Sequence, residues 1–366
     1  MAVVEGAGSR HILFDYHYTL NGTNSALLSQ KQQAWVPYLF TKSVDRTSYI
    51  GTASGISANA TLDLPVSELT TAELIPEVMQ AAKDHFEPWN TRLFNDPRVT
   101  FYVGDGRHLL THSDSPQDLV ICDLFLPSRA GSSHLYSVDF FRAVRATLSP
   151  EGSLCLWLPA YQLNAESMQV IMRTFSEVFE HALILRGNFD AIQPTIALLG
   201  SAHPFDISEA SILDRLQHPT IQYLRDQSLF FRSVGNARLA LIGDLKTMND
   251  QLEEYPINSD DRPWISFNAP RRIENGERIR GTTLLDFMGR SFLTTPWPST
   301  LLNRTEIERL RPFIRAGNYA YASRVAAFPV PDISAAETLK RQTNATRLEL
   351  EAMRLAPGID LRSVEN

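Results

Sequence analysis

Short apolar runs alternate with longer stretches of helical spacing from about residue 47 to residue 200. This alternation is typical of successive strand–helix–strand units that build a parallel sheet. Strands are expected at 47–50, 68–73, 99–103, 118–123, 153–158, 182–186 and 194–199. Helices are expected at 55–64, 75–86, 105–111, 138–148 and 165–179, each about as long as a crossover between parallel strands requires.

The last two expected strands are joined differently from the others. Only a short segment with turn character separates 182–186 from 194–199, so a helix has no room and the two strands should pair antiparallel. Such an ending is typical of methyltransferase-like sheets. The pattern therefore predicts an α/β fold with a doubly wound, seven-stranded, Rossmann-like sheet.

The two ends of the chain carry other patterns. Strand-like runs around HILFDYHYTL are followed by Asn21-Gly22, a tight-turn pair, and then by a helical stretch that should end near Pro37. Beyond residue 300, apolar residues three and four apart predict helices. We expect an N-terminal β-hairpin and helix (1–42), a nucleoside-binding catalytic domain (43–272) and a helical C-terminal extension (273–366).

Composition narrows the classes of partner. The sequence is 43% hydrophobic and 20% charged, and no segment approaches the roughly 18 apolar residues of a membrane span. The start of the chain lacks the features of a signal peptide, so a cytoplasmic protein without membrane contact is expected. A formal charge of -7 and the lack of a basic run argue against nucleic acid as a partner.

The sequence offers no metal-ligand pattern. Cys122 and Cys155 both lie inside expected strands, where cysteine behaves as a small apolar residue. The nine histidines show no HExxH or clustered spacing. We therefore expect neither a disulfide nor a bound metal.

A glycine pair and a glutamate lie at the ends of the first two strands. Gly51 and Gly55 lie where the first strand turns into a helix, which would let the backbone approach a ligand. Glu73 ends the second strand 22 residues after Gly51, close to the roughly 20-residue offset at which an acidic residue reaches ribose hydroxyls. The spacing favours a nucleoside site, although each feature alone also suits an ordinary turn.

Two aspartates follow the next strands at the same edge. Asp105, beside Gly106, could accept a hydrogen bond from an adenine amino group or cap the following helix. Asp123 ends the fourth strand, beside the point where the strand order should reverse and where ligands of such sheets bind. A carboxylate there can stabilise or deprotonate an attacking amine. The polar loop LPSRAGSSHLYS then follows.

Residues 48–160 resemble the catalytic domain of spermidine synthases, the polyamine aminopropyltransferases. The glycine loop Gly51 to Ile56, Glu73, the turn Gly104 to Arg107, and the loop Asp123 to Ser137 occur in the family's order. DPRVTFYVGDGRHLL and HLYSVDFFRAVRATLSPEGSLCLWLP are the most similar stretches. Weaker similarity extends through NSDDRPWISFNAPRR to bacterial chains in which such a domain follows membrane segments, so a soluble part of a membrane-anchored protein is a second setting.

The resemblance implies a transferase of polyamine biosynthesis. Its co-substrate would be S-adenosylmethionine or its decarboxylated form, its acceptor a small amine, and its assembly a homodimer. The donor would contact Gly51, Ser54, Gly55, Glu73, Asp105, Gly106 and Asp123. Asp123 and Tyr136, from the Leu-Tyr-Ser of the loop, would be the catalytic residues.

Two positions depart from the family. Ser54 stands where aminopropyltransferases carry the aspartate that holds the donor ammonium, and Leu126 stands where a second aspartate binds the diamine. Asp15, Asp260 and Asp261 are candidate replacements. Tyr161 and Gln162, after the fifth strand, are expected with Leu126 in the acceptor pocket, although packing roles suit them equally.

Three functional hypotheses follow. The first is alkyl transfer from an S-adenosyl sulfonium donor, with aminopropyl transfer favoured by the resemblance and methyl transfer favoured by Ser54, which would tolerate the carboxylate of S-adenosylmethionine. The second is a nucleoside-binding or regulatory module without turnover. A nicotinamide-dependent enzyme is disfavoured because Gly51 to Gly55 lacks the GxGxxG spacing.

Overall fold

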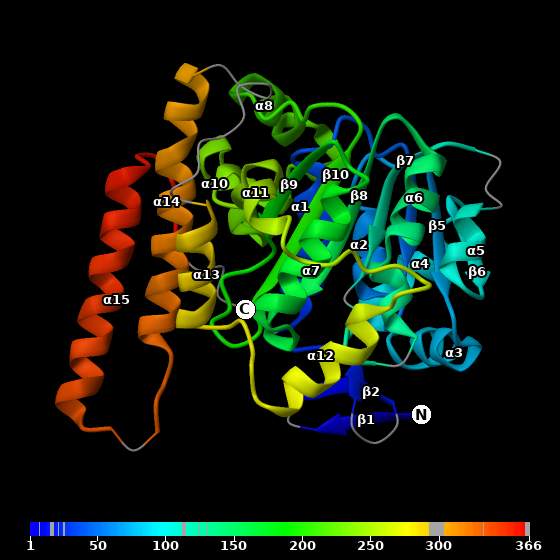
Figure 1. The fold of residues 1–366 in the computed structure, drawn as a ribbon, viewed down its shortest axis with the longest axis horizontal. Coiled ribbons are helices and arrows are strands. Elements are labelled where there is room, and N and C mark those ends of the chain that lie inside the picture. Colours follow the sequence, from blue (N-terminus) through cyan, green and yellow to red (C-terminus); the bar gives the residue numbers. More distant parts are fainter. Residues whose placement is uncertain are drawn as a thin grey trace.

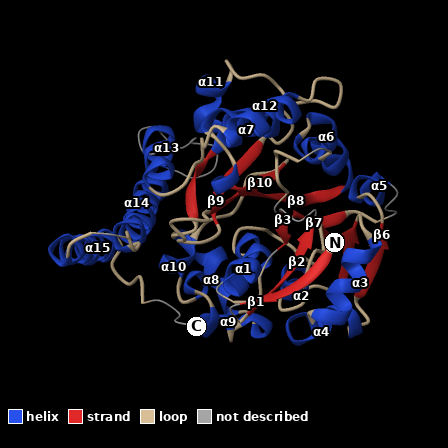
Figure 2. Cartoon of the chain, turned by 90° about the horizontal axis from the view of Figure 1, so that it is seen from below, coloured by secondary structure: helices blue, strands red, loops and turns tan. Residues whose placement is uncertain are grey.

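A twisted eight-stranded sheet forms the centre of the protein (Figures 1 and 2). The computed structural model describes residues 1–6, 8–14, 18–20, 22–24, 26–111, 115–123, 125–129, 131–292, 304–331 and 333–362. The strands run in the order β11-β9-β10-β8-β7-β4-β5-β6. They are β4 (Arg46–Ile50), β5 (Glu68–Glu73), β6 (Val99–Val103), β7 (Gln117–Cys122), β8 (Leu148–Pro159), β9 (His181–Arg186), β10 (Thr195–Ser201) and β11 (Leu241–Asp244).

The predicted α/β sheet is confirmed, with one addition. All seven expected strands are present, and β10 pairs antiparallel with both β8 and β9, as their short connection predicts. The eighth strand, β11, pairs antiparallel with β9. Its four residues lie in a region whose pattern predicts mixed helices and turns, because a strand this short leaves almost no periodic signal.

Helices cover both faces of the sheet, as Figure 2 shows. Successive side chains of a strand point to opposite faces, so Tyr49 and Ile50 of β4 belong to different apolar clusters. The helices that follow the N-terminal strands are α1 (Ala26–Tyr38), α2 (Ile56–Thr61), α3 (Pro76–His85), α4 (Glu87–Asn95), α5 (Gly106–Thr111), α6 (Val138–Thr147) and α7 (Ala165–Ser176). Helix α4 lies outside the expected set, since Pro88 marks a new helix start rather than the end of α3.

The N-terminal hairpin is present and carries a third strand. Its strands are β1 (Ala2–Gly6), β2 (Ser9–Phe14) and β3 (Tyr18–Leu20), paired in that order. Gly8, at φ 72°, lies in the turn between β1 and β2. Gly22 follows β3, in agreement with a turn after the strand-like runs, while Asn21 lies outside the described residues.

Helices predominate after β10, and the helices predicted beyond residue 300 are present. Its helices are α8 (Glu209–Gln217), α9 (Leu224–Gln227), α10 (Val234–Arg238), α11 (Asn249–Leu252), α12 (Trp264–Glu274), α13 (Thr282–Phe292), α14 (Arg304–Ala327) and α15 (Ala335–Leu355). Leu310 and Ile314 of α14 are buried in the same cluster as Leu241 of β11. Helix α14 therefore extends the main core, and α15 packs on the outer side of α14, with Ala352 in the same cluster (Figure 1). Within the described residues, no helix has the length and apolarity needed to cross a membrane.

A buried arginine joins α14 to the sheet. The guanidinium of Arg186, at the end of β9, is 3% exposed and donates to the Leu239 carbonyl at 2.6 Å and to Asn318 Oδ1 at 2.7 Å. Burial lowers the pKa of Arg186 to about 10, although the nearby Tyr321 acts in the opposite direction. Gly317 allows this approach, because a Cβ there would lie 2.5 Å from Arg186 Nη1.

We predict that Gly317→Ala destabilises the protein even though alanine favours helices. The new methyl group would displace Arg186 and cost about 1 to 3 kcal/mol of unfolding free energy. Gly289→Ala in α13 is the matched control, because nothing lies within 4 Å of its added Cβ, and it should gain about 0.5 to 1 kcal/mol. Chemical denaturation measures both, and equal effects would refute the packing argument.

Candidate functional site

The carboxyl ends of β4 and β7 meet where the strand order reverses. The Asp123 amide donates to the Ile50 carbonyl at 3.0 Å, which brings Asp123 beside Gly51. Gly51 has φ 94°, and a Cβ there would lie 3.4 Å from the Asp123 Cβ and 3.1 Å from the Phe125 ring. Asp123 is 5% exposed. Gly51 and Asp123, two of the predicted site residues, therefore lie next to each other.

Glu73 holds the glycine loop from the neighbouring strand. Its two carboxylate oxygens accept from the Ala53 amide at 3.0 Å and the Ile75 amide at 3.1 Å. Burial raises the pKa of Glu73 above its usual range, and the backbone N–H groups of Ala53, Ile75 and Leu74 offset part of that rise. Each carboxylate oxygen can accept more than one hydrogen bond, so Glu73 can bind the loop and a ligand together.

Ser54 and Gly55 both serve the packing of the loop. The Ser54 hydroxyl is 1% exposed and donates to Gln30 Oε1 of α1 at 3.2 Å. Gly55 has φ 78°, and a Cβ there would lie 3.0 Å from Asn90 and Leu93 of α4. Contact of either residue with a donor stays a prediction.

Asp105 and Gly106 form the turn into α5. Asp105 Oδ1 accepts from the Arg107 amide at 2.9 Å, which is the capping role expected as one alternative. The side chain is partly exposed at the sheet edge, so its second oxygen leaves room for the adenine role. A Cβ on Gly106 would lie 2.6 Å from Ile50 Cγ2, which explains why glycine begins this helix.

Asp260 lies beside α5, and both of its carboxylate oxygens have partners. Its carboxylate pairs with Arg107 Nη2 at 2.5 Å and with His134 Nδ1 at 3.1 Å. Burial opposes its ionisation, but hydrogen bonds from Arg107, Ser137 and His134 outweigh burial and lower the pKa of Asp260. An aspartate so paired is a poor replacement for an acceptor-binding carboxylate. Asp261 is exposed, and Asp15 lies outside the described residues.

Tyr136 fastens the loop that follows Asp123. Its side chain is fully buried, and its hydroxyl donates to the Phe125 carbonyl at 2.5 Å. Leu126, half-buried in the same loop, accepts from the Arg129 amide at 3.0 Å through its carbonyl. The geometry is that of a positioning residue, and the catalytic assignment of Tyr136 stays a prediction.

Asn258 fixes the other end of this loop, a role that the sequence pattern does not reveal. Its side-chain amide donates to the Ser133 carbonyl at 3.1 Å and the Tyr136 carbonyl at 3.0 Å, and accepts from the Ile265 amide at 3.1 Å. The residue is completely buried. Asn258 belongs to the NSDDRPW segment, one of the stretches similar to the family. This segment therefore holds the loop in place through the hydrogen bonds of its asparagine.

Two tyrosines lie near Asp123. Tyr161 follows β8 in a short 3₁₀ turn (Ala160–Gln162), and Gln162 is half-buried in the same turn. Burial, followed by the negative charges of Asp123 and Asp190, raises the pKa of Tyr161 to about 12. Tyr49 is completely buried, and burial followed by the charge of Asp123 raises its pKa well above the usual range. Both rings therefore offer neutral hydroxyl groups beside a buried carboxylate.

Leu74 is a further residue that sequence reasoning missed. It directly follows Glu73, yet its side chain is 65% exposed at the carboxyl edge. An exposed leucine beside a buried glutamate marks an apolar surface next to a polar one, which only the structure reveals. Elsewhere, no group of three or more histidine, cysteine or acidic side chains in the described ranges could hold a metal ion.

Comparison with known proteins identifies a related domain. Residues 36–185 match the family model described as the spermine/spermidine synthase domain. A polyamine aminopropyltransferase of Korarchaeum cryptofilum is 26% identical over 60% of this chain and 67% of its own length. Polyamine aminopropyltransferase 2 of Hyperthermus butylicus is 29% identical over 31% of this chain and 38% of its own. The predicted resemblance to spermidine synthases is confirmed for this region.

The matches cover only part of some of these relatives. The chain spans between about two fifths and just over half of the length of the first two curated relatives that it matches. The spermidine synthase structure from Thermotoga maritima covers 75% of this chain and 86% of its own at 14% identity, with a TM-score of 0.47. The fold assignment therefore rests on the observed sheet order.

We predict that Asn258→Ala loosens the loop after Asp123. The substitution leaves buried carbonyls of Ser133 and Tyr136 without their donor, which should lower the free energy of unfolding by about 2 to 4 kcal/mol. Asn95→Ala is the control, because its exposed amide donates only to the Thr91 carbonyl, and it should cost less than about 0.5 kcal/mol. Denaturant unfolding that gave similar losses would contradict the clamp.

Proposed function

Because residues 36–185 match the spermine/spermidine synthase domain, we propose that the protein transfers an alkyl group from an S-adenosyl sulfonium donor to a small amine. The observation that carries the proposal is the buried Asp123, held against Gly51 where the strand order reverses, with Glu73 on the adjacent strand. The names of the relatives favour aminopropyl transfer from decarboxylated S-adenosylmethionine.

The nucleoside half of the donor would lie across the ends of β4, β5 and β6. Glu73 would accept hydrogen bonds from the two ribose hydroxyls. Leu74 offers an exposed apolar surface for one side of the adenine, and Asp105 would accept from its amino group. Gly51 adopts a positive φ angle and has no side chain, so the backbone at this edge can approach the ligand.

Methyl transfer is the second candidate, and position 54 is what favours it. The Ser54 hydroxyl points to Gln30, and no carboxylate at this position faces the donor tail. A donor that keeps its own carboxylate, as S-adenosylmethionine does, would meet no like charge there. The relative affinity for the two donors separates the candidates.

Asp123 would act on the acceptor. The amine nitrogen attacks the carbon bonded to the sulfonium, a C–N bond forms, and the C–S bond breaks with its electron pair passing to sulfur. The proton that leaves nitrogen passes to Asp123, and a neutral thioether nucleoside is released. The buried carboxylate is well suited to hold an N–H group in line, and such proton transfer is worth about 10²- to 10⁴-fold in rate.

The acceptor would approach past Tyr161. This side chain lies within the electrostatic influence of both Asp123 and Asp190, so its surroundings favour a cationic or hydrogen-bonding amine. Gln162 can add a hydrogen bond. Leu126 cannot pair with a second ammonium group, which favours an acceptor with an apolar segment on that side.

A nucleoside-binding module without turnover is the alternative from another class. It would bind the same ligands but release no thioether product. Incubation of the protein with each donor and a set of amines, followed by measurement of methylthioadenosine and S-adenosylhomocysteine, distinguishes the enzyme from the binding module. Methylthioadenosine would indicate aminopropyl transfer, and S-adenosylhomocysteine would indicate methyl transfer.

We predict that Asp123→Asn lowers the rate of product formation by about 10²- to 10⁴-fold, because the amide cannot take the proton. Asp84→Asn, on the exposed face of α3, should leave the rate unchanged. If the protein binds a donor but forms no product with any acceptor, the proposed enzymatic activity is rejected in favour of a binding module.

A further inference from the structure

Helix α15 is covered on one side only. Ala345 and Ala352 are buried against α14, and the two helices form an arm that projects from the body of the protein (Figure 1). Ser334 caps the start of α15 by accepting from the Glu337 amide at 3.2 Å. At 21 residues, the helix is about 30 Å long.

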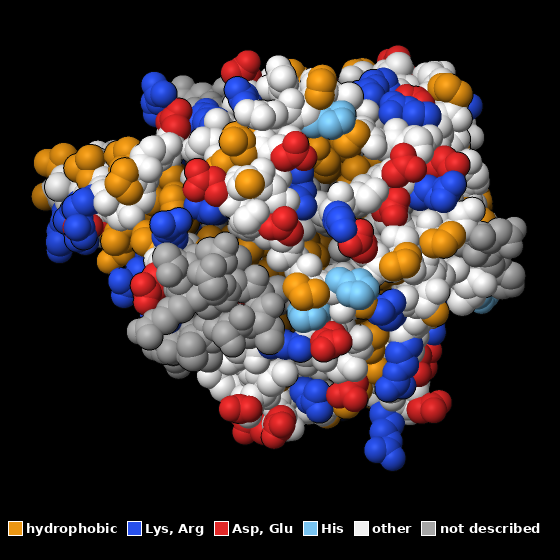
Figure 3. Space-filling model, turned by 90° about the horizontal axis from the view of Figure 1, so that it is seen from above, with side chains coloured by type: hydrophobic (Ala, Val, Ile, Leu, Met, Phe, Trp, Pro, Cys, Tyr) orange, Lys and Arg blue, Asp and Glu red, His pale blue; other side chains and the backbone are white. Residues whose placement is uncertain are grey.

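The opposite side of α15 carries an exposed apolar stripe. Leu339 is 64% exposed, Leu350 59% and Met353 38%. Their spacings of 11 and 14 residues correspond to about three and four helical turns, so the three side chains share one face. Thr343 and Thr346 fill the positions between them. Figure 3 shows hydrophobic side chains along the projecting arm.

Two ion pairs lie on α15, one near each end, and in both the acidic residue precedes the basic one by three positions. Near the N-terminus, Lys340 pairs with Glu337 at 3.9 Å, and near the C-terminus, Glu351 pairs with Arg354 at 2.8 Å. Lys340 and Glu351 lie on the same flank of the stripe, because 11 residues separate them as well. A helix turned end for end would therefore present Glu351 to Lys340.

We propose that the apolar stripe of α15 binds the same stripe of a second copy of this chain, with the two helices antiparallel about a two-fold axis between Ala345 and Thr346. In this register Leu339 packs between Leu350 and Met353 of the other copy. Lys340 opposes Glu351, and the two-fold symmetry forms this pair twice. A closed dimer requires such a self-complementary surface.

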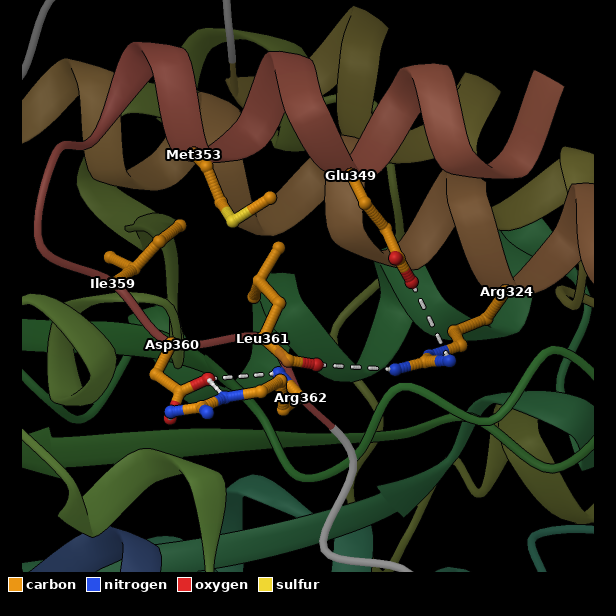
Figure 4. A pocket seen from close by; sticks show the side chains of 7 residues that line it. All are labelled: Arg324, Glu349, Met353, Ile359, Asp360, Leu361 and Arg362. Carbon is orange, nitrogen blue, oxygen red and sulfur yellow. Dashed lines mark hydrogen bonds and ion pairs between the residues drawn. The ribbon is translucent and has the colours of Figure 1, made fainter. Parts of the chain in front are cut away.

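A hollow continues the stripe at its C-terminal end. It has a volume of about 830 Å³ and lies between α14, α15 and the segment 359–362 (Figure 4). Met353 lines both the stripe and the hollow, whose other apolar residues are Ile359 and Leu361. The start of the second copy's α15, with Leu339, covers this end of the stripe and enlarges the contact beyond the helix pair.

A second copy suits this surface better than a membrane or an unrelated protein. Only three strongly apolar residues line the stripe, and threonines separate them, so it is too polar for the interior of a bilayer. When the helix is turned end for end, Glu351 takes the place of Lys340, so an identical helix supplies the opposite charge at each position. The mutual arrangement of Lys340 and Glu351 therefore identifies the occupant.

The mass of the full chain in solution tests the proposal. We expect sedimentation equilibrium to give twice the 41.2 kDa of one chain at high concentration. Leu339→Glu with Leu350→Glu should weaken the dimer by about a hundredfold or more. At a concentration low enough for the natural protein to be monomeric, the melting temperature should stay the same, because both side chains are exposed on the monomer. Leu213→Glu, at an exposed leucine of α8, should leave the mass unchanged. A dimer that survives the double substitution, or a monomer at all concentrations, would overturn the proposal.

Charge reversal tests the register itself. Lys340→Glu and Glu351→Lys should each weaken the dimer by about tenfold, and the combined variant should recover most of the loss because the opposed charges are restored. Thr346→Cys, next to the axis, should form a disulfide between copies, whereas Asn344→Cys on another face should not. The native Cys122 and Cys155 are completely buried and leave this assay clean. The antiparallel pairing would be rejected if the losses of dimer affinity added up in the combined variant, or if cysteines at positions 346 and 344 cross-linked equally well.

Discussion

The close approach of β4 and β7 at Gly51 and Asp123 is the constraint on which the candidate site depends. A side chain at position 51 would strike Phe125 and crowd Asp123, so the carboxylate can lie next to the loop backbone only because residue 51 is glycine. Glu73 holds the same loop from the other side through the Ala53 amide. Together they place two carboxylates from different strands around one edge of the sheet, where a ligand of a doubly wound fold binds.

Around that edge, several polar side chains are bound to other parts of the protein. Asn258 and Tyr136 fix the two ends of the loop that follows Asp123, and Arg107 and His134 engage Asp260 behind it. These contacts fix the loop that follows Asp123 and the turn behind it. Such preorganisation is what a transferase needs in order to align an amine with a sulfonium carbon.

The sequence predicts the seven strands, the antiparallel end and the edge on which the site residues lie, because strand periodicity and carboxyl-edge positions are local signals. It cannot predict that the Ser54 hydroxyl turns to Gln30 or that Asp260 pairs with Arg107, since those contacts join segments 24 and 153 residues apart. The short strand β11 and the exposure of Leu74 are likewise consequences of tertiary packing. The sequence thus predicts which polar residues lie at the carboxyl edge of the sheet, but not which residues they bind by hydrogen bonds or ion pairs.

We propose above all that Glu73 and its neighbours bind a nucleoside thioether or sulfonium. Calorimetric titration with methylthioadenosine, which lacks both a charged sulfur and an amino tail, isolates that claim. We compare the natural protein with Glu73→Gln and with Glu68→Gln, an exposed residue at the start of the same strand. The account predicts binding that Glu73→Gln weakens by about 10- to 100-fold and Glu68→Gln leaves unchanged. Equal affinities for all three proteins, or no binding to the natural protein, would contradict it.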